Sequence, residues 1–262
     1  MLKLLKYEWK ACARTCLPLY GVLILMSLIS RILYVIPKNA SLDFMLPAIG
    51  SMLYMGVMMA AFVVTAVILI QRFYKNLLGS EGYLMFTLPV TVSQHLLSKT
   101  IIAVVMIALS GIAAFLSIGI FADMSFGTLF VDMIKGVARS GGLLFGLELL
   151  VLAVLGIADM ALFVYMCMAL GHLASRHRLL MSIVWYVVLS TALQVLMLMV
   201  MMGVGNAMPQ PFVDLMKVWW SGITPMGAAH LMLRFCCVFT LLSDAVYFLV
   251  TRWILVHKLN LE

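Results

Sequence analysis

Residues 71–99 read QRFYKNLLGSEGYLMFTLPVTVSQHLLSK and lie between two apolar runs that are each long enough to cross a bilayer. A short helix in this polar stretch would be trapped at the membrane face and would lie flat against it. Another protein could push on such a helix and so act on the membrane-spanning helices on either side. The stretch therefore predicts a helical membrane protein with a contact surface on one side of the membrane.

The composition of the chain points to the same class. Hydrophobic residues make up 65% of the 262 residues, charged residues only 10%, and the mean hydropathy is +1.17. No soluble domain of this length buries so large an apolar share. The apolar runs are continuous, which excludes the alternating pattern of a transmembrane β-barrel and leaves helices to satisfy the backbone in lipid. We expect an all-α, polytopic integral membrane protein with a single transmembrane domain over residues 1–262.

Six apolar runs predict six transmembrane helices. They cover roughly residues 17–36, 48–70, 100–122, 143–170, 180–202 and 232–256. The first run is longer than the apolar part of a signal peptide, and no small-x-small cleavage site follows it, so we expect the N-terminal segment to be retained.

Lysine and arginine are distributed unevenly between the predicted loops. With the N-terminus inside, eleven of the 17 lie on the cytoplasmic side and six on the outer side. Because cytoplasmic loops carry the excess of these residues, we expect a multi-pass protein of the cell membrane with both termini cytoplasmic. The net charge of +7 then reflects topology and contact with anionic membrane lipids, not nucleic-acid binding, since no soluble basic domain is present.

Residues 1–16 predict an amphipathic helix in the cytoplasmic interface. Basic residues line one helical face and apolar residues recur at spacings of three and four on another. The basic residues are Lys3, Lys6, Lys10 and Arg14, and the apolar ones are Leu2, Leu5, Trp9, Cys12 and Cys16. Such a helix lies in the interface with its tryptophan at headgroup depth. The alternative is a basic anchor that does no more than orient the first span.

Residues 203–231 are apolar and rich in aromatic residues, yet helix breakers interrupt them. The breakers are Pro209, Pro211, Gly222 and Pro225. A continuous span is therefore excluded, and two short helices that dip back into the outer leaflet fit best. Trp219 and Trp220 would lie near the interface.

Four ionisable residues fall inside the predicted spans, where each costs roughly 2.5 to 3.5 kcal/mol to insert. Asp159 and Asp244 lie near the middle of the membrane and could line a substrate path or relay protons, or could equally be hydrogen-bonded core acids. Arg31 and Glu148 lie at equal depth near the outer face and form a candidate ion pair, with Arg234 as the alternative partner.

The sequence lacks three common nucleotide-binding and catalytic motifs. The sequence contains no Gly-x-x-x-x-Gly-Lys phosphate loop, no His-Glu-x-x-His and no Gly-x-Ser-x-Gly. Its five cysteines include no Cys-x-x-Cys pair, and we read them as buried or interfacial thiols. We therefore expect no catalytic, cofactor-binding or metal-binding residues, and no enzymatic activity in this chain by itself.

The order of these features resembles a known family. A basic amphipathic N-terminal helix leads into LPLYG at residues 17–21, two spans flank YKNLLGSEGYLMFTLP at residues 74–89, and a broken outer segment precedes the last span. This arrangement resembles the permease subunit of an ABC-2 type exporter, of the kind common in Gram-positive Firmicutes. The topology of the whole chain fits, and residues 74–89 carry the specific part of the resemblance.

The resemblance implies partners and sites. A separate cytosolic ATP-binding-cassette dimer would bind ATP and Mg²⁺ and hydrolyse the nucleotide, and two permease copies, or this chain and a related permease, would form the pore. The loop between spans two and three would carry the coupling helix, whose partner-contacting residues are Glu81, Gly82, Tyr83, Leu84, Phe86, Thr87 and Pro89. The outer segment would form the extracellular gate, with Pro209, Pro211, Trp219, Trp220 and Pro225.

The residues of the loop agree with this reading. Gly79 and Gly82 break the helix that descends from span two. Large apolar side chains then follow on a cytoplasmic surface, where exposed groups of this kind mark a partner site. Pro89 ends the element, and residues 91–94, TVSQ, form a capping box that restarts a helix. The alternative is a membrane-hugging loop without a partner.

We therefore expect a permease that moves an amphipathic or lipophilic substrate outward, with an antimicrobial peptide or a drug favoured over a glycan by analogy. An ion-coupled secondary transporter built on Asp159 and Asp244 is one alternative. A membrane assembly or signalling protein without transport is the other.

Overall fold

The computed structural model shows helices and the turns that end them, with no strand among the residues that it describes. It describes residues 2–35, 45–79, 90–122, 131–132, 135–136, 142–174, 177–207, 211, 222 and 224–258. Six helices in these ranges are long and apolar enough to cross a membrane. This confirms the predicted helical class and, at each of the six predicted positions, a helix long and apolar enough to cross a membrane.

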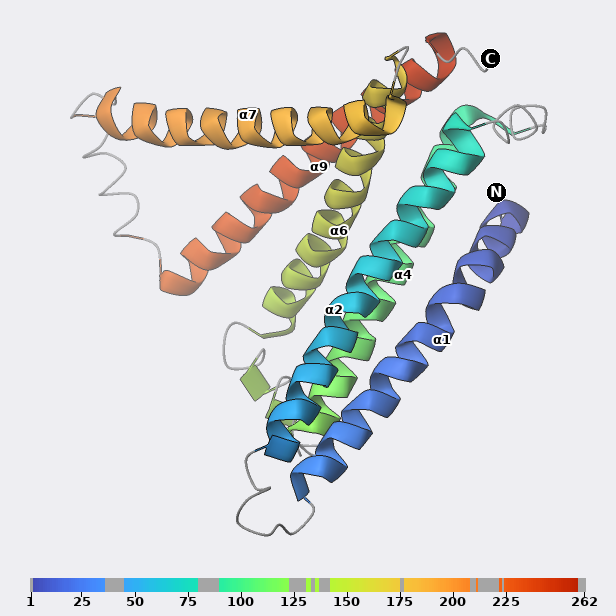
Figure 1. The fold of residues 1–262 in the computed structure, drawn as a ribbon. Helices are drawn as coiled ribbons and strands as arrows, with labels where there is room; N and C mark the ends of the chain where they lie inside the picture. Colours follow the sequence, from blue (N-terminus) through green and yellow to red (C-terminus); the bar gives the residue numbers. More distant parts are fainter. Residues whose placement is uncertain are drawn as a thin grey trace. The chain divides into compact units, whose positions relative to one another are not determined.

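The six helices follow one another in the order that hydropathy predicts (Figure 1). They are α1 (Leu2–Val35), α2 (Met45–Phe73), α4 (Val92–Phe121), α6 (Gly142–His172), α7 (Arg178–Ala207) and α9 (Pro225–His257), and a π-helical turn, η1 (Tyr74–Leu78), continues α2. Each helix is longer than its predicted span. An apolar window identifies only the part of a helix that suits hydrocarbon, whereas backbone hydrogen bonding carries the helix on into its polar flanks.

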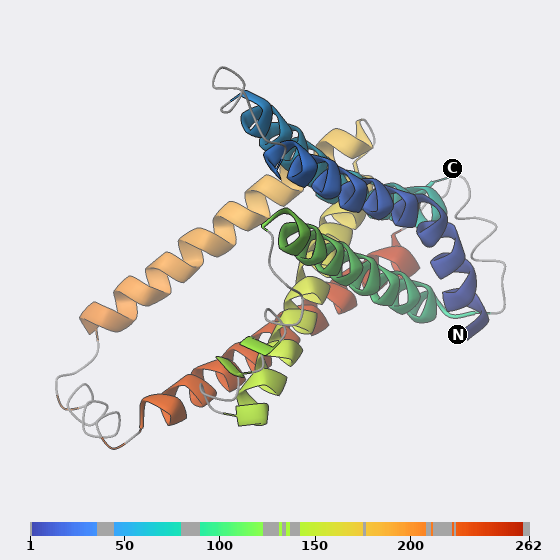
Figure 2. The same cartoon turned by 90° about the horizontal axis from the view of Figure 1, so that it is seen from below.

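The N-terminal segment differs from the prediction. Residues 2–16 are not a separate helix but the first turns of α1, which contains Pro18 in its interior. Proline removes a backbone hydrogen bond and crowds the preceding turn, which bends a helix without ending it. Figure 2 shows α1 changing direction toward its N-terminal end. That these turns lie in the membrane interface stays a prediction.

The chain divides into two compact units, Met1–Gly136 and Val137–Glu262, and each is described here by itself. In the first unit α1 packs along both α2 and α4. The hydroxyl of Tyr20 on α1 lies 3.2 Å from Thr65 Oγ1 on α2 and donates to the carbonyl of Met106 on α4 at 3.1 Å. With Ser30 Oγ donating to the Gly50 carbonyl at 2.9 Å, α1 is antiparallel to α2, and with Arg31 donating to the Ile120 carbonyl at 3.2 Å, α1 is parallel to α4.

In the second unit α6 packs along both α7 and α9. Phe163 on α6 stacks edge-on against Tyr186 of α7 and tilts against Tyr247 of α9, each with 5.4 Å between ring centroids. Away from the turn that joins them, α7 diverges from α6 (Figure 1). No part of the most apolar window of α7 or α9 is buried, so both helices offer broad apolar faces.

The outer segment is shorter than predicted. Residues 203–207 belong to α7 and residues 225–231 belong to α9. Thr224 caps α9, because its side chain accepts a hydrogen bond from the Gly227 N–H at 3.2 Å, and Pro225 occupies the first turn, where a missing N–H costs nothing. Pro225 therefore starts a helix and does not interrupt one. The re-entrant form of residues 208–224 stays a prediction, because only Pro211, Gly222 and Thr224 are described there and Pro209, Trp219 and Trp220 are not.

The close approach of α6 and α7 depends on Gly171. A Cβ atom at this position would collide with the backbone nitrogen, the Cα and the Oγ of Ser182. We expect Gly171→Ala to lower the midpoint of thermal unfolding in detergent by several degrees, because overpacking typically costs about 1–3 kcal/mol.

The control for this variant is Gly156→Ala, also on α6, where an added Cβ meets nothing within 4 Å. That change should leave the midpoint unchanged or raise it slightly, since glycine weakens a helix interior. Equal midpoints for the two variants would contradict the close packing of α6 and α7.

Candidate functional site

The candidate site is the base of the polar loop between α2 and α4. The residues that resemble a coupling helix lie outside the described part of the chain, and their assignment stays a prediction: Glu81, Gly82, Tyr83, Leu84, Phe86, Thr87 and Pro89. The structure describes the two stems from which this loop leaves and to which it returns. The stems determine which helices a force on the loop would reach.

The outgoing stem is η1, the π-helical turn at the end of α2. Leu77 and Leu78 are both fully buried, so the turn is fixed by packing. It ends at Gly79, whose N–H donates to the Tyr74 carbonyl at 2.8 Å and whose backbone is extended, with φ −89° and ψ −174°. A Cβ at Gly79 would lie 2.9 Å from the Lys75 carbonyl oxygen, so glycine is needed here for a close approach. The predicted helix break at Gly79 is confirmed.

The returning stem begins with the predicted capping box. The Thr91 hydroxyl accepts from the Gln94 N–H at 3.4 Å, and the Gln94 side-chain oxygen accepts from the Thr91 N–H at 3.2 Å. These two bonds satisfy backbone donors that the first turn of α4 would otherwise leave unpaired. The capping box is confirmed, and it fixes where α4 starts.

A buried charged cluster joins both stems to the N-terminal turns of α1. The Glu8 carboxylate accepts a hydrogen bond from Lys99 Nζ at 2.8 Å, and its other oxygen lies 3.4 Å from Arg72 Nη2. Glu8 comes from α1, Arg72 from the last turn of α2, and Lys99 from the second turn of α4. We call these three residues the Glu8 cluster. It joins three helices next to the two stems, since Arg72 directly precedes η1 and Lys99 lies two turns into α4.

Two of the three side chains in the Glu8 cluster are buried, so removal of one partner would strongly destabilise the fold. Glu8 is 6% exposed and Lys99 is 5% exposed, whereas the Arg72 side chain keeps 26% of its surface accessible. Arg72 also donates to the Cys12 sulfur at 3.5 Å, one turn beyond Glu8 on the same face of α1. Loss of one partner from a buried pair leaves an uncompensated charge and costs more than the pair itself contributes.

The sequence analysis did not identify this cluster. Arg72 and Lys99 were counted among the cytoplasmic cations and given no partner, and Glu8 was assigned to neither face of the N-terminal helix, whereas Glu8 and Lys99 are buried together. One signal was available. Glu8 is the only acidic residue among the first 42, so in a basic segment it was the natural partner for a cation.

Asp159 and Asp244 come from α6 and α9 of the second unit, at the level where Phe163 meets Tyr247. Asp159 precedes Phe163 by about one turn of α6, and Asp244 precedes Tyr247 by about one turn of α9, so the two acids lie at a similar level of neighbouring helices. Each carboxyl has one buried oxygen without a hydrogen-bond donor among the described residues. The structure therefore brings the two mid-span acids together, and their role in a substrate path stays a prediction.

Glu148 is paired near the outer end of α6. One carboxylate oxygen accepts from Arg234 Nε at 2.8 Å and the other lies 2.5 Å from His230 Nδ1. Arg234, predicted as the alternative partner of Glu148, is thus the observed one, and His230 was not predicted. Arg31 lies in the other unit, where it donates to the Ile120 carbonyl at 3.2 Å, so a pair between Arg31 and Glu148 stays a prediction.

Metal-binding groups are not found in the part of the chain that the structure describes. No set of three or more His, Cys, Asp or Glu residues in the described ranges is placed to hold a metal ion. All five cysteines are free thiols, and three of them are buried. The described chemistry is therefore that of buried charge pairs and apolar helix faces.

The Glu8 cluster makes a direct prediction for stability. Glu8→Gln removes the carboxylate that lies 2.8 Å from the buried Lys99 ammonium, so we expect the free energy of unfolding to fall by about 3 kcal/mol or more. In the double variant Glu8→Gln/Lys99→Met the stranded charge is gone, and the loss should be smaller than the sum of the two single changes. Thermal or denaturant unfolding in detergent measures this cycle, and strict additivity would reject the pairing.

The Glu148 cluster makes a second prediction. Thermal unfolding should compare Glu148→Gln, Arg234→Gln and the double variant. The double variant should lose less stability than the sum of the losses in the two single variants. Arg31→Gln combined with Glu148→Gln serves as the comparison and should be additive if Arg234 is the true partner. Additivity with Arg234, together with coupling to Arg31, would contradict the observed pairing.

Comparison with known proteins does not assign the chain to a family. No protein-family model, no curated protein and no solved structure matches the chain.

Proposed function

We propose that this chain is the membrane-spanning permease subunit of an ATP-driven exporter of the ABC-2 type. Six helices long and apolar enough to cross a membrane support a permease body. The sequence has no phosphate loop, so ATP and Mg²⁺ would be bound by a separate cytosolic ATP-binding-cassette dimer. In this proposal the chain performs no hydrolysis itself and converts movement of its partner into movement of its helices.

The single observation that carries the proposal is the Glu8 cluster at the base of the loop. A contact on residues 80–89 would act first on the two stems, η1 and the start of α4. Because Glu8 holds Arg72 and Lys99 at 3.4 and 2.8 Å, displacement of either stem would also displace α1. The buried leucines of η1 and the capping box at Thr91 hold both stems rigid. A displacement of the loop would therefore be transmitted to α2 and α4.

The pore in this proposal needs a second permease, either another copy of the chain or a related one. The apolar faces of α7 and α9, which the second unit leaves uncovered, supply surface for lipid, for that second permease or for an apolar substrate. An amphipathic or lipophilic substrate fits such a surface, and an antimicrobial peptide or a drug is the favoured class. The outer gate would include Pro209, Pro211, Trp219, Trp220 and Pro225.

An ion-coupled secondary transporter is the second candidate. It is favoured by one observation, the buried carboxyl oxygens of Asp159 and Asp244 that have no hydrogen-bond donor among the described residues. Acids of this kind inside a membrane commonly relay protons or bind cations. This candidate gives the loop between α2 and α4 no partner and the Glu8 cluster only a structural role.

The two candidate functions make different predictions for variants in the loop between α2 and α4. If Tyr83 and Phe86 are apolar anchors in a groove of the ATPase, then removing either side chain should cost at least about 2 kcal/mol of binding, or roughly 30-fold in affinity. We expect Tyr83→Ala and Phe86→Ala to reduce co-purification of the proposed ATP-binding-cassette partner. Membrane insertion and protein abundance should stay normal.

Met85→Ala is the matched control, because Met85 lies between the two anchors and is not among the partner-contacting residues. It should leave the complex intact. Full ATPase binding and full transport by the Tyr83→Ala/Phe86→Ala double variant, at normal abundance, would refute the assignment of the loop.

A further inference from the structure

One amide side chain lies in the middle of the uncovered apolar face of α7. Gln194 is three residues from the midpoint of the predicted span 180–202, or about 5 Å along the helix axis, and its side chain is exposed. It lies about 24 Å beyond Arg178, in the part of α7 that diverges from α6 (Figure 1). No residue in the described ranges forms a hydrogen bond with this amide.

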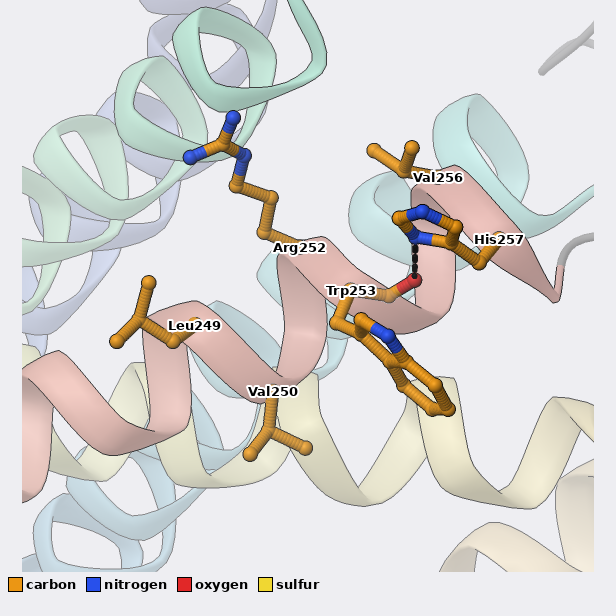
Figure 3. A pocket seen from close by; sticks show the side chains of 6 residues that line it. All are labelled: Leu249, Val250, Arg252, Trp253, Val256 and His257. Atoms are coloured by element: carbon orange, nitrogen blue, oxygen red, sulfur yellow. Dashed lines mark hydrogen bonds between the residues drawn. The ribbon is translucent and has the colours of Figure 1, made fainter.

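Water cannot satisfy an amide at this depth. The hydrocarbon core is about 30 Å thick, so the nearer membrane face is roughly 10 Å away along the helix, beyond the reach of the Gln194 side chain. The exposed polar groups on the last turns of α9 differ, because Arg252 and His257 lie at the predicted cytoplasmic face, where headgroups and water reach them (Figure 3). Gln194 therefore needs a hydrogen-bond partner from another helix.

The first unit offers no such partner among its described residues. The polar side chains at middle depths of α1, α2 and α4 are hydroxyl groups that are buried in that unit and already hydrogen-bonded there. They are Tyr20, Ser27, Tyr54, Thr65, Ser110 and Ser117. The side chains that these helices expose at the same depths are apolar, so the first unit could cover Gln194 but could not satisfy it.

The second unit does not satisfy Gln194 either. Ser190 and Thr191, the nearest polar residues on α7, donate to carbonyls of α7 itself. The carboxyl oxygens of Asp159 and Asp244 that lack a donor are buried, whereas the Gln194 side chain is exposed. The partner of this amide must therefore come from another chain.

Gln194 belongs to a stripe of α7 that faces away from α6. Val187, Gln194 and Met201 recur every seven residues, which places them nearly in line along the helix, and all three are exposed. We call these three residues the Gln194 stripe. The residues of α7 that contact α6, Ser182 and Tyr186, lie about 100° away around the helix. The stripe is thus free to meet a partner while α6 and α7 stay packed.

A second copy of the chain supplies the group that Gln194 lacks. Two copies in one membrane share one orientation, so a twofold axis along the membrane normal brings a residue of α7 to its own counterpart at the same depth. An amide both donates and accepts, so two Gln194 side chains can satisfy each other with two hydrogen bonds. Glutamine commonly joins membrane-spanning helices in this way.

We propose that two copies of this chain associate through α7, with their Gln194 amides hydrogen-bonded to each other in the membrane and with Val187 and Met201 packed against their counterparts. The proposed exporter needs a second permease of either kind, and here the partner is an identical chain and the surface is the Gln194 stripe. Dimerisation through another surface would refute this assignment and leave the exporter intact. Loss of the ATPase contact would refute the exporter and leave the dimer intact.

The first test counts subunits of the labelled full chain by single-molecule photobleaching in liposomes, as the ratio of lipid to protein is raised. Gln194→Leu keeps the size of the side chain and suits hydrocarbon, so α7 stays inserted, but we expect the dimer to weaken roughly fivefold or more. Gln194→Asn keeps an amide and should form a tighter dimer than Gln194→Leu does.

Thr240→Val is the matched control for this test. It removes a polar group of similar depth from α9, where the hydroxyl donates to the Cys236 carbonyl of the same helix at 2.9 Å, and it should leave the dimer unchanged. A monomeric wild type would overturn the proposal. So would equal dimer fractions for the wild type and Gln194→Leu.

The second test locates the surface by cysteine cross-linking in membranes. Met201→Cys lies on the Gln194 stripe, whereas Met199→Cys lies at nearly the same depth on the opposite side of α7, and both methionines are exposed. Oxidation with copper phenanthroline should cross-link Met201→Cys between copies, above the background that the five native cysteines give in the wild type, and should not cross-link Met199→Cys. Equal yields at the two positions, or none at Met201→Cys, would assign the stripe to lipid or to the first unit and refute the proposal.

Discussion

The Glu8 carboxylate determines how the first three helices can be arranged. A buried carboxylate requires compensation, and here the compensation comes from Lys99 at 2.8 Å and Arg72 at 3.4 Å, on two different helices. The register of α1 against α2 and α4 is therefore set at this end by charge, and by the Tyr20 and Ser30 hydrogen bonds along the rest of its length. Lipid offers no competing hydrophobic force, so polar pairs and close contacts of this kind select one packing.

The same constraint links the fold to the proposed function. A loop that only connected two spans would need no buried charge beneath it, because its stems could be solvated at the membrane face. Here both stems are held, one by buried leucines and the other by a capping box, and α1 is bound to each through Glu8. A partner that moved the loop would move a three-helix unit. The second unit also has one helix, α6, that packs along two others, α7 and α9. There an ion pair between Glu148 and Arg234 joins α6 to α9.

Much of the architecture was predictable because lipid leaves few choices. Continuous apolar runs require helices, and local signals fixed the break at Gly79 and the capping box at Thr91 and Gln94. The Glu8 cluster was not predictable in the same way. Glu8 and Lys99 are 91 residues apart, and hydropathy treats a cation near a span end as solvated. The continuity of α1 past Pro18 was missed because a proline that bends a helix and one that ends it look alike in sequence.

In the proposed function, force from ATP hydrolysis enters this chain through the loop between α2 and α4. The most direct measurement is uptake of a labelled lipophilic peptide into inverted proteoliposomes that contain the chain and the proposed ATP-binding-cassette partner. The account predicts accumulation that requires hydrolysable ATP and continues after a protonophore collapses the proton gradient. Accumulation without the ATPase, abolished by the protonophore, would contradict the account and assign the transport to Asp159 and Asp244.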